Sequence, residues 1–289
     1  MKEFSHLVQF FFGGLTAGSI YALMAVSLVI VYRTSRLICF SQGEFFVFGV
    51  LIMASLLSRR LPLALAFFLS LFCCAVMGGL IQHGVIKRLL KRPIGILIVM
   101  TIAISLSLRG FALLMWGRES YVVPSFSKTP PINCMGATLP SQVFWIMGVT
   151  GIVLVCLWYF FEKTITGLAM RACAENPDAA SLMGINVQKM SLFAWMWGGA
   201  LGALAGMVVA PLLFIQYTSG IMPMVKGFIA MAIGGLTGIP GAALGGFFLG
   251  LTEAFTIGCI SSRFSDAIVF TILILILIFK PQGLFGRSE

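Results

Sequence analysis

The sequence predicts an all-α membrane protein, a polytopic helix bundle of about eight spans in a single domain covering residues 1–289. Two observations predict it. First, 60% of the 289 residues are hydrophobic and only 10% are charged, with a mean hydropathy of +1.05. A soluble domain carries roughly 25% charged residues, so this chain lacks the charge to cover a soluble surface. Second, the chain is a series of apolar stretches, at 7–32, 38–57, 61–86, 94–116, 141–161, 191–216, 224–258 and 266–279.

Two stretches need separate treatment. The stretch 7–32 follows Lys2 as a signal peptide would, but it is long enough to be retained as the first span. The stretch 224–258 is too long for one crossing and is interrupted by residues that a continuous helix disfavours. We expect a broken or re-entrant backbone near 234–246, buried in protein or lining a cavity. The expected hinge or break residues are Gly234, Gly235, Gly238, Pro240 and Gly241.

Two loops are long enough to have structure of their own. Residues 117–140 are rich in proline and are expected to form an irregular extramembrane loop. Residues 162–190 mix charged residues with good helix formers and are expected to form one or two short helices outside the membrane. The dense basic cluster at 87–92 should be cytoplasmic. That orientation places 162–190 inside, 117–140 and the N-terminus outside, and Lys226 among the basic residues of the outer end.

Composition also excludes several classes of function. The net charge of +10 comes from basic residues mostly at the ends of apolar stretches, as membrane topology requires, so no nucleic-acid partner is expected. The seven cysteines are scattered without a CxxC motif, which predicts neither a disulfide framework nor a metal site. No Walker A sequence is present, and His6 and His83 have no obvious partners. The chain is therefore not expected to be an enzyme or to hold a cofactor.

Polar residues inside the apolar stretches are candidates for function, because a charge in a bilayer is costly. Ser41, Gln42 and Glu44 open the second stretch, and Glu253 lies late in the chain. One interpretation places these four residues along a polar translocation path at broken helices.

Two alternatives to this path remain open. In a structural interpretation, Glu44 caps a helix or pairs with Arg36, and Glu253 pairs with Arg109 inside the bundle. In a functional one, Glu44, Arg109 and Glu253 form an ion or proton relay of a secondary transporter or channel.

The inside loop contains a sequence that predicts a very short helix. Asn176 is a good N-cap, Pro177 suits the first turn, and Asp178 lies near the positive end of the helix dipole. Residues 179–182 continue the helix and Gly184 ends it. A helix of barely two turns does not stabilise itself, so it is expected to dock on another protein. The alternative is a surface loop without a partner.

With these motifs in view, the chain resembles the permease subunits of branched-chain amino acid ABC transporters over essentially its whole length. The short helix resembles the coupling helix that such permeases insert into a cleft of the ATPase. Asp178-Ala179-Ala180 followed by Gly184 is similar to the EAA signature of permeases, with Asp in place of Glu, although the downstream part of that signature is not recognisable. The motifs that carry the resemblance are Ala17–Leu23, Phe40–Glu44, Gly167–Glu175, Ala179–Asn186, Gly234–Gly246 with Glu253, and Lys280–Gly286.

The resemblance implies an importer permease of the shorter, H type in the bacterial inner membrane, in contact with lipid. Implied partners are a second homologous permease, two ATP-binding subunits that hold ATP and Mg, and a periplasmic substrate-binding protein. The implied substrates are branched-chain or related amino acids, while related permeases carry urea or short amides. The family often has His where this chain has Gln42, which changes the polarity of the expected path. Residues implied to couple the chain to the ATPase are Arg171, Glu175, Pro177, Asp178, Ala179, Ala180 and Gly184.

Overall fold

The computed structural model describes residues 2–89, 92–127, 130–134, 137–259, 261–280 and 282–285. Leu90 and Lys91 of the basic cluster, and Pro281 and Gly286 of the C-terminal motif, lie outside the described residues. Within the described ranges, seven helical segments are long and apolar enough to cross a membrane. Two shorter apolar helices accompany them, so the expectation of about eight spans in a helical bundle is confirmed.

The long segments are α1 (Lys2–Ser35), α3 (Leu63–Ile81) continued by η1 (Gln82–Ile86) and α4 (Lys87–Leu89), α5 (Ile94–Trp116), α6 (Ser141–Lys163), α9 (Val187–Val209), α11 (Ile239–Cys259), and η2 (Ser262–Phe264) with α12 (Ser265–Phe279). The two shorter apolar helices are α2 (Gln42–Ser58) and α10 (Ile221–Gly234). The loops contain α7 (Ile165–Glu175), α8 (Pro177–Leu182) and the strands β1 (Ile132–Cys134) and β2 (Ala137–Leu139). These antiparallel strands pair Ile132 with Leu139, so the outer loop is less irregular than expected.

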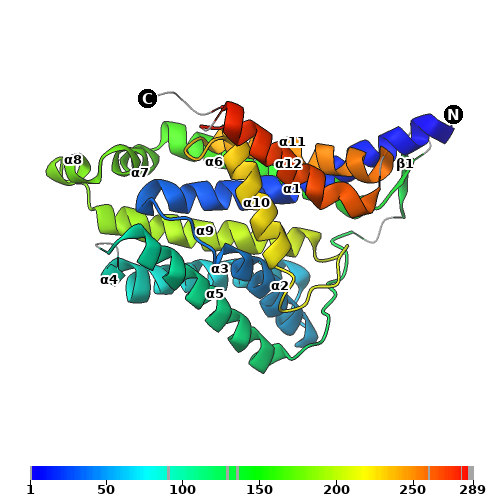
Figure 1. The fold of residues 1–289 in the computed structure, drawn as a ribbon. Coiled ribbons are helices and arrows are strands. Elements are labelled where there is room, and N and C mark those ends of the chain that lie inside the picture. The colour runs from blue at the N-terminus through cyan, green and yellow to red at the C-terminus, as the bar shows by residue number, and fades with distance from the viewer. Residues whose placement is uncertain are drawn as a thin grey trace.

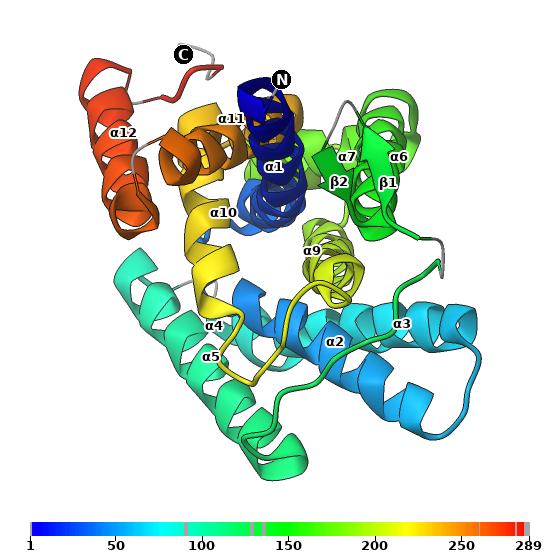
Figure 2. The ribbon, with the colours of Figure 1, turned by 90° about the vertical axis from the view of Figure 1, so that its right-hand side faces the viewer.

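Helix α1 forms the centre of the bundle, with α9, α10 and α11 around it (Figures 1 and 2). In α1 and α9, 78% of the apolar window is buried, against 11% in α12 and 22% in both α5 and α6. The poorly buried helices carry large exposed apolar side chains such as Val99, Leu106, Ile152 and Ile274. Such a surface is stable in contact with lipid or with the apolar helices of another membrane subunit, so these helices form the apolar outer layer of the bundle.

Small residues set the closest helix contact, between α1 and α11. Gly246 packs against the backbone of Ala22, and Gly250 packs against Gly18, so closely that a side chain at either glycine would collide with α1. Gly14 lies against Leu251 in the same way. This is the close approach that a GxxxG pattern allows between membrane helices.

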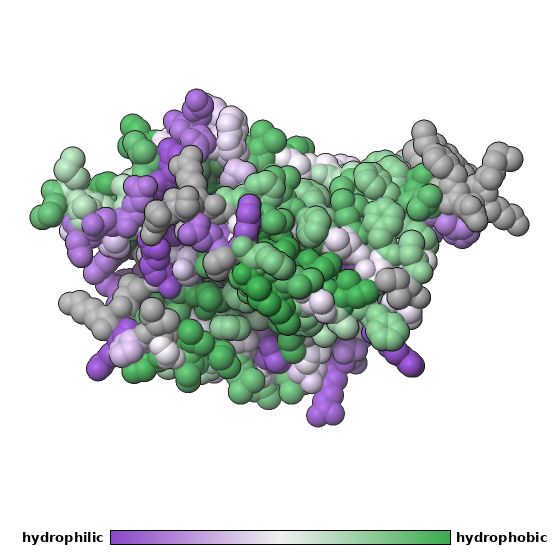
Figure 3. Space-filling model, turned by 45° about the horizontal axis from the view of Figure 1, so that its top comes forward, coloured by the Kyte–Doolittle hydropathy of each residue, from purple (hydrophilic) through white to green (hydrophobic). Residues whose placement is uncertain are grey.

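The two ends of the bundle carry the loops that the topology assigns to opposite sides. Helices α4, α7 and α8 lie at the left end in Figure 1, while the N-terminus and β1 lie at the right end. Figure 3 shows hydrophobic side chains over the middle of one face and hydrophilic ones gathered at the end of α7 and α8. The predicted inside loop and the predicted outside loop are therefore separated by the length of the apolar bundle.

The stretch 224–258 is broken as expected, but the break is shorter than predicted. Helix α10 ends at Gly234, Gly235 has a φ of 106°, and α11 begins at Ile239. Pro240 and Gly241 therefore belong to the first turn of α11, where a proline lacks no needed hydrogen bond. Since α10 has only 14 residues, it is too short to cross a bilayer of ~30 Å hydrocarbon thickness by itself.

The connection between the first two apolar stretches, expected between residues 32 and 38, reaches further along the chain than predicted. The sequence placed a span at 38–57, but α2 begins only at Gln42, after a non-helical segment in which Arg36 has a φ of 52°. Leu37, Cys39 and Ser41 of this segment are almost fully buried. Irregular backbone at membrane depth is tolerated where protein surrounds it, so hydropathy alone does not reveal such a segment. The stretch 191–216 was also too long, because α9 ends at Val209 before Pro211.

Candidate functional site: two ion pairs in the bundle and an exposed short helix

The first ion pair joins the start of α2 to α5. Glu44 is 2% exposed, and its Oε1 accepts hydrogen bonds from Arg109 Nη2 at 2.6 Å and from Ser105 Oγ at 2.8 Å. The predicted pairing of Glu44 with Arg36 is therefore wrong. Arg36 instead donates to the carbonyl of Ala174 in α7. A paired charge is far less costly in a bilayer than a single one, which explains why both charges are tolerated here.

The other predicted path residues of this segment are held by the bundle. Gln42 is fully buried and donates through Nε2 to the carbonyl of Gly198 in α9. Ser41 Oγ lies 3.0 Å from Cys39 Sγ. Among the described residues, Gln42 Oε1 and Glu44 Oε2 are buried without a hydrogen-bond partner. Because buried polar atoms are normally paired, these two acceptors mark a place where water or a ligand would find hydrogen-bonding groups.

The second ion pair lies between α10 and α11. Lys226 Nζ is 2.5 Å from Glu253 Oε1 and 3.1 Å from Asp266 Oδ1 at the start of α12. Tyr21 of α1 donates from its hydroxyl to Glu253 Oε2 at 2.8 Å. Glu253 is thus paired with Lys226, and the predicted pair between Glu253 and Arg109 is wrong. Four helices contribute to this cluster.

The four expected path residues fall into two groups with different partners. Ser41, Gln42 and Glu44 belong to the start of α2, while Glu253 belongs to the cluster on α10 and α11. The two groups are linked through backbone, because Gly43 packs directly against Gly220 at the start of α10. The sequence therefore identified both polar groups but not the helix α10 that connects them.

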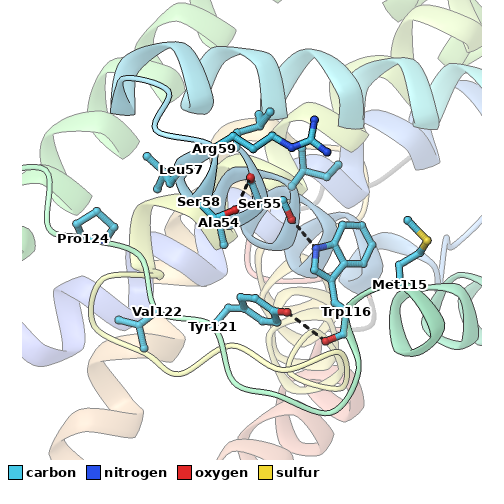
Figure 4. A pocket seen from close by; sticks show the side chains of 12 residues that line it. Ala54, Ser55, Leu57, Ser58, Arg59, Met115, Trp116, Tyr121, Val122 and Pro124 are labelled. Atoms are coloured by element: carbon cyan, nitrogen blue, oxygen red, sulfur yellow. Dashed lines mark hydrogen bonds between the residues drawn. The ribbon is translucent and has the colours of Figure 1, made fainter.

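A cavity of about 790 Å³ lies at the far end of α2. Figure 4 shows Trp116 and Tyr121 facing the last turns of α2, which carry Ser55 and Arg59. Trp116 Nε1 donates to Ser55 Oγ at 2.6 Å, and the Tyr121 hydroxyl donates to the carbonyl of Trp116 at 3.2 Å. None of the predicted path residues lines this cavity, which lies beside the loop assigned to the outside.

The predicted short helix is present and is capped as expected. Asn176 Oδ1 accepts hydrogen bonds from the backbone N–H groups of Asp178 and Ala179, both at 3.0 Å. Helix α8 ends at Leu182, and Gly184 adopts a φ of 82°, the left-handed conformation of a helix stop. The helix therefore ends two residues before Gly184, the residue at which it was predicted to end.

The exposed face of this short helix differs from the expected one. Ala180 is only 4% exposed and faces the protein, although it was expected among the residues that couple to a partner. The side chains that project furthest are apolar: Leu182 is 88% exposed and Met183 is 83% exposed. Large apolar side chains at the polar end of a membrane protein have no lipid to cover them, so they indicate a docking surface for a protein.

The short helix is connected to the glycine break by two arginines, Arg33 in the last turn of α1 and Arg36 just after it. Arg36 Nη2 donates to the carbonyl of Ala174 in α7, at 2.6 Å, and Arg33 Nε donates to the carbonyl of Thr237 in the break between α10 and α11. Of the other predicted coupling residues, Arg171 is paired with Glu162 at 2.9 Å, while Glu175 is exposed. The end of α1 and the residue that follows it thus contact the break and the inside loop.

The C-terminal motif also contacts the break. The N–H of Leu284 donates to the carbonyl of Ile233 at 2.7 Å, which satisfies one of the free carbonyls at the end of α10. Gly283 has a φ of 82° and lies directly against Gly235. The described part of the C-terminal motif therefore packs against the break.

The sequence analysis did not select three functional candidates, which are Lys226, Arg33 and Arg36. The sequence analysis counted Lys226 only as a basic residue at the outer end. In the structure, Lys226 lies in the apolar helix α10 and forms an ion pair with Glu253. The available signal was a lysine within an apolar stretch, at a depth where charges are costly.

These features define a class of protein: a polytopic helical membrane permease with broken helices, paired charges in the bundle and an exposed short helix at one end. The chain belongs to the family of permease components of branched-chain amino acid transport systems, whose model matches residues 10–277. Relatives include the high-affinity branched-chain amino acid permease LivH of Escherichia coli, 30% identical over 100% of this chain and 98% of the relative. BraD of Pseudomonas aeruginosa, of the same description, is 31% identical over 100% of this chain and 99% of the relative.

More distant similarity extends to another transport system. The ribose import permease RbsC of Haemophilus influenzae is 29% identical over 78% of this chain and 69% of the relative. Among solved structures, PsaBC of Streptococcus pneumoniae in complex with a Fab matches with a TM-score of 0.50 and 13% identity, over 96% of this chain and 92% of the other. This last match supports the fold alone.

Proposed function

We propose that the chain is the membrane permease subunit of an ABC importer that moves branched-chain or related amino acids inward across the bacterial inner membrane. The observation that carries this proposal is the full-length similarity to LivH and BraD, both described as high-affinity branched-chain amino acid permeases. The chain itself is not an enzyme in this account. ATP and Mg are bound by two partner ATP-binding subunits, and a periplasmic protein delivers the substrate to a pair of permeases.

In the proposed mechanism, α8 is the contact with the ATPase. Its exposed Leu182 and Met183 suit a hydrophobic cleft on a partner. Asn176 and Pro177 hold the first turn rigid, so that a push on α8 is passed to α7 and not lost in local unfolding. The wider set of coupling residues in this proposal is Arg171, Glu175, Pro177, Asp178, Ala179, Ala180 and Gly184. Ala180 is buried on the side of α8 that faces the protein, so its proposed role is to support the helix.

The break between α10 and α11 is the proposed moving part. Arg36 connects α7 to the end of α1, and Arg33 connects the end of α1 to Thr237. A displacement of α8 would therefore reach Gly234, Gly235 and Gly238, where the backbone changes direction. Pro240 and Gly241 begin α11 and complete the proposed hinge. Helix α10 would then tilt and carry Lys226 with it.

The proposed path runs past Ser41, Gln42, Glu44 and Glu253. Paired charges suit such a path, because each carboxylate already has a cationic partner and the groups do not trap a passing zwitterion. The buried acceptors on Gln42 and Glu44 add hydrogen-bonding capacity without net charge.

ATP-driven uptake by the reconstituted transporter tests this proposal. The chain would be placed in vesicles with its partner permease, ATP-binding subunits and binding protein, and uptake of labelled leucine would be measured with ATP, without ATP, and with a proton gradient. We expect uptake only with ATP, and competition by unlabelled leucine and valine but not by urea. Competition by urea would identify a permease for urea or short amides, and uptake driven by the proton gradient would indicate a secondary transporter.

A further inference from the structure

A small cavity lies where the start of α10 meets α1 and α2. Its volume is about 310 Å³, at the lower end of the ~300–1,000 Å³ typical of small-ligand pockets. Most of its lining is apolar, and a few polar groups converge on it, which is the usual composition of a ligand site. The lining residues that matter here are Tyr21, Phe46, Ile215, Ser219, Met222 and Lys226.

Lys226 supplies the charge of this lining. Its ammonium group has three N–H donors, and the described structure gives it two carboxylate acceptors, Glu253 Oε1 at 2.5 Å and Asp266 Oδ1 at 3.1 Å. One donor is left for a ligand. The ring of Tyr21 lies 5.7 Å from Lys226 Nζ, and its hydroxyl holds Glu253 in place. The ammonium group is thus positioned from two sides, and the Lys226 side chain is only 14% exposed.

The chemistry around the cavity matches the two charges of an amino acid. A carboxylate would accept the remaining donor of Lys226 in a charge-assisted hydrogen bond. The cluster of one ammonium and two carboxylates has a net negative charge, which attracts the ammonium group of the same ligand. An aliphatic side chain would pack on the apolar wall formed by Phe46, Ile215 and Met222.

We propose that this cavity is a transient binding site for a zwitterionic aliphatic amino acid, with the carboxylate bound by Lys226 and the side chain against Phe46 and Met222. The proposal deepens the proposed function and rests on it. It places the substrate where Gly220 of α10 packs on Gly43, beside the start of α2 and within reach of the Glu253 cluster. A neutral ligand such as urea has no charge to pair with Lys226 and no aliphatic side chain to pack on the apolar wall.

The site is built to bind weakly. Glu253 and Asp266 compete with the substrate for the ammonium group of Lys226, and a site within a transport path must release what it binds. The same helix that holds the substrate at Lys226 ends at the glycine break, where Arg33 contacts Thr237. Movement of α10 would therefore change the pocket.

Protection of a cysteine at Ser219 from a thiol reagent tests the proposal without requiring transport. Ser219 is half-buried in the lining, and the purified full chain without the substitution provides the background from native cysteines. We expect millimolar leucine to slow labelling of the S219C variant most and 4-methylpentanoate to slow it less, whereas 3-methylbutylamine and urea should slow it least. The amine has the same apolar chain but no carboxylate, so equal protection by the amine would overturn the role of Lys226.

Three variants separate ligand binding from a purely structural role. Replacing the pair, Lys226→Met with Glu253→Gln, removes both charges together and so avoids an unpaired buried charge. It should weaken protection by leucine about tenfold or more, the effect of losing one charge-assisted hydrogen bond. Lys226→Arg should keep protection, and Arg263→Gln, an exposed charge change on η2, should also keep it. Unchanged protection in the paired variant would overturn the proposal.

The two proposals fail separately. If leucine does not protect the cysteine while vesicles with the unsubstituted chain take up leucine with ATP, the cavity proposal is overturned and the proposed function stands. If leucine protects the cysteine but no ATP-driven uptake occurs, the proposed function is overturned and the cavity proposal stands.

Discussion

At the scale of single residues, charge pairs explain how a chain with so few charged side chains places some of them inside its bundle. Glu44 with Arg109, and Lys226 with Glu253 and Asp266, each bring opposite charges from different helices into contact. Each contact therefore also fixes how two helices lie against each other. A charge that loses its partner would remain in an apolar surrounding, where it costs several kcal/mol.

The pair of Glu44 and Arg109 gives a prediction at this scale. Glu44→Gln alone should lower the free energy of unfolding by about 3 kcal/mol or more, because it leaves Arg109 without its counter-charge. Glu44→Gln combined with Arg109→Gln should cost less than the sum of the two single changes. A double-mutant cycle by detergent titration of the purified chain measures the coupling. Strict additivity of the two changes would show that the contact has no energetic role.

At the scale of helices, packing of glycine against backbone determines the core. Helix α1 approaches α11 closely because Gly14, Gly18, Gly246 and Gly250 have no side chains at the crossing. In the proposed mechanism, this contact holds the central pair together while other helices move. Helices α2 and α10, which are shorter than a bilayer is thick, rest on this pair and on α9.

Neighbouring glycines in α1 provide a matched test of this packing. A side chain at Gly14 would meet Leu251 Cα at 2.9 Å, whereas a side chain at Gly13 meets nothing within 4 Å. Gly14→Val should therefore lower stability by about 1–3 kcal/mol through overpacking, seen as a lower midpoint of thermal unfolding in detergent. Gly13→Val brings the same change in helix propensity and should have a clearly smaller effect. Equal shifts would show that the crossing is not tightly packed.

The sequence predicts the long helices well because apolar length is a direct consequence of the bilayer's thickness. It also predicts α8, since Asn176, Pro177 and Gly184 act on their own backbone. Contacts between segments far apart in the chain could not be predicted in the same way. The partners of Glu44 and Glu253 are set by how the helices pack, and the buried segment after Arg36 has the hydropathy of a helix. Apolar composition also does not predict which side chains of α8 are buried: Ala180 faces the protein, whereas Leu182 faces outward.

At the scale of the whole molecule, the chain has an apolar outer layer, a largely apolar interior with a few paired charges, and one end with exposed apolar side chains at α8. Arg33 of α1 and Arg36, just after α1, join that end to the glycine break, and α10 joins the break to the Lys226 cluster. Together these contacts form a continuous mechanical connection from α8 to the proposed path. They account for the proposed division of labour, in which ATP is hydrolysed on a partner while this chain moves.

The contact between α8 and an ATP-binding subunit is the central claim, and photocrosslinking measures it most directly. Benzoylphenylalanine would replace Leu182, which is 88% exposed on the short helix, and as a control Leu114, which is 86% exposed near the end of α5. In the assembled transporter, irradiation should link position 182, and not position 114, to the ATP-binding subunit. An intact complex that gives no crosslink from position 182, or equal crosslinks from both positions, would contradict the account.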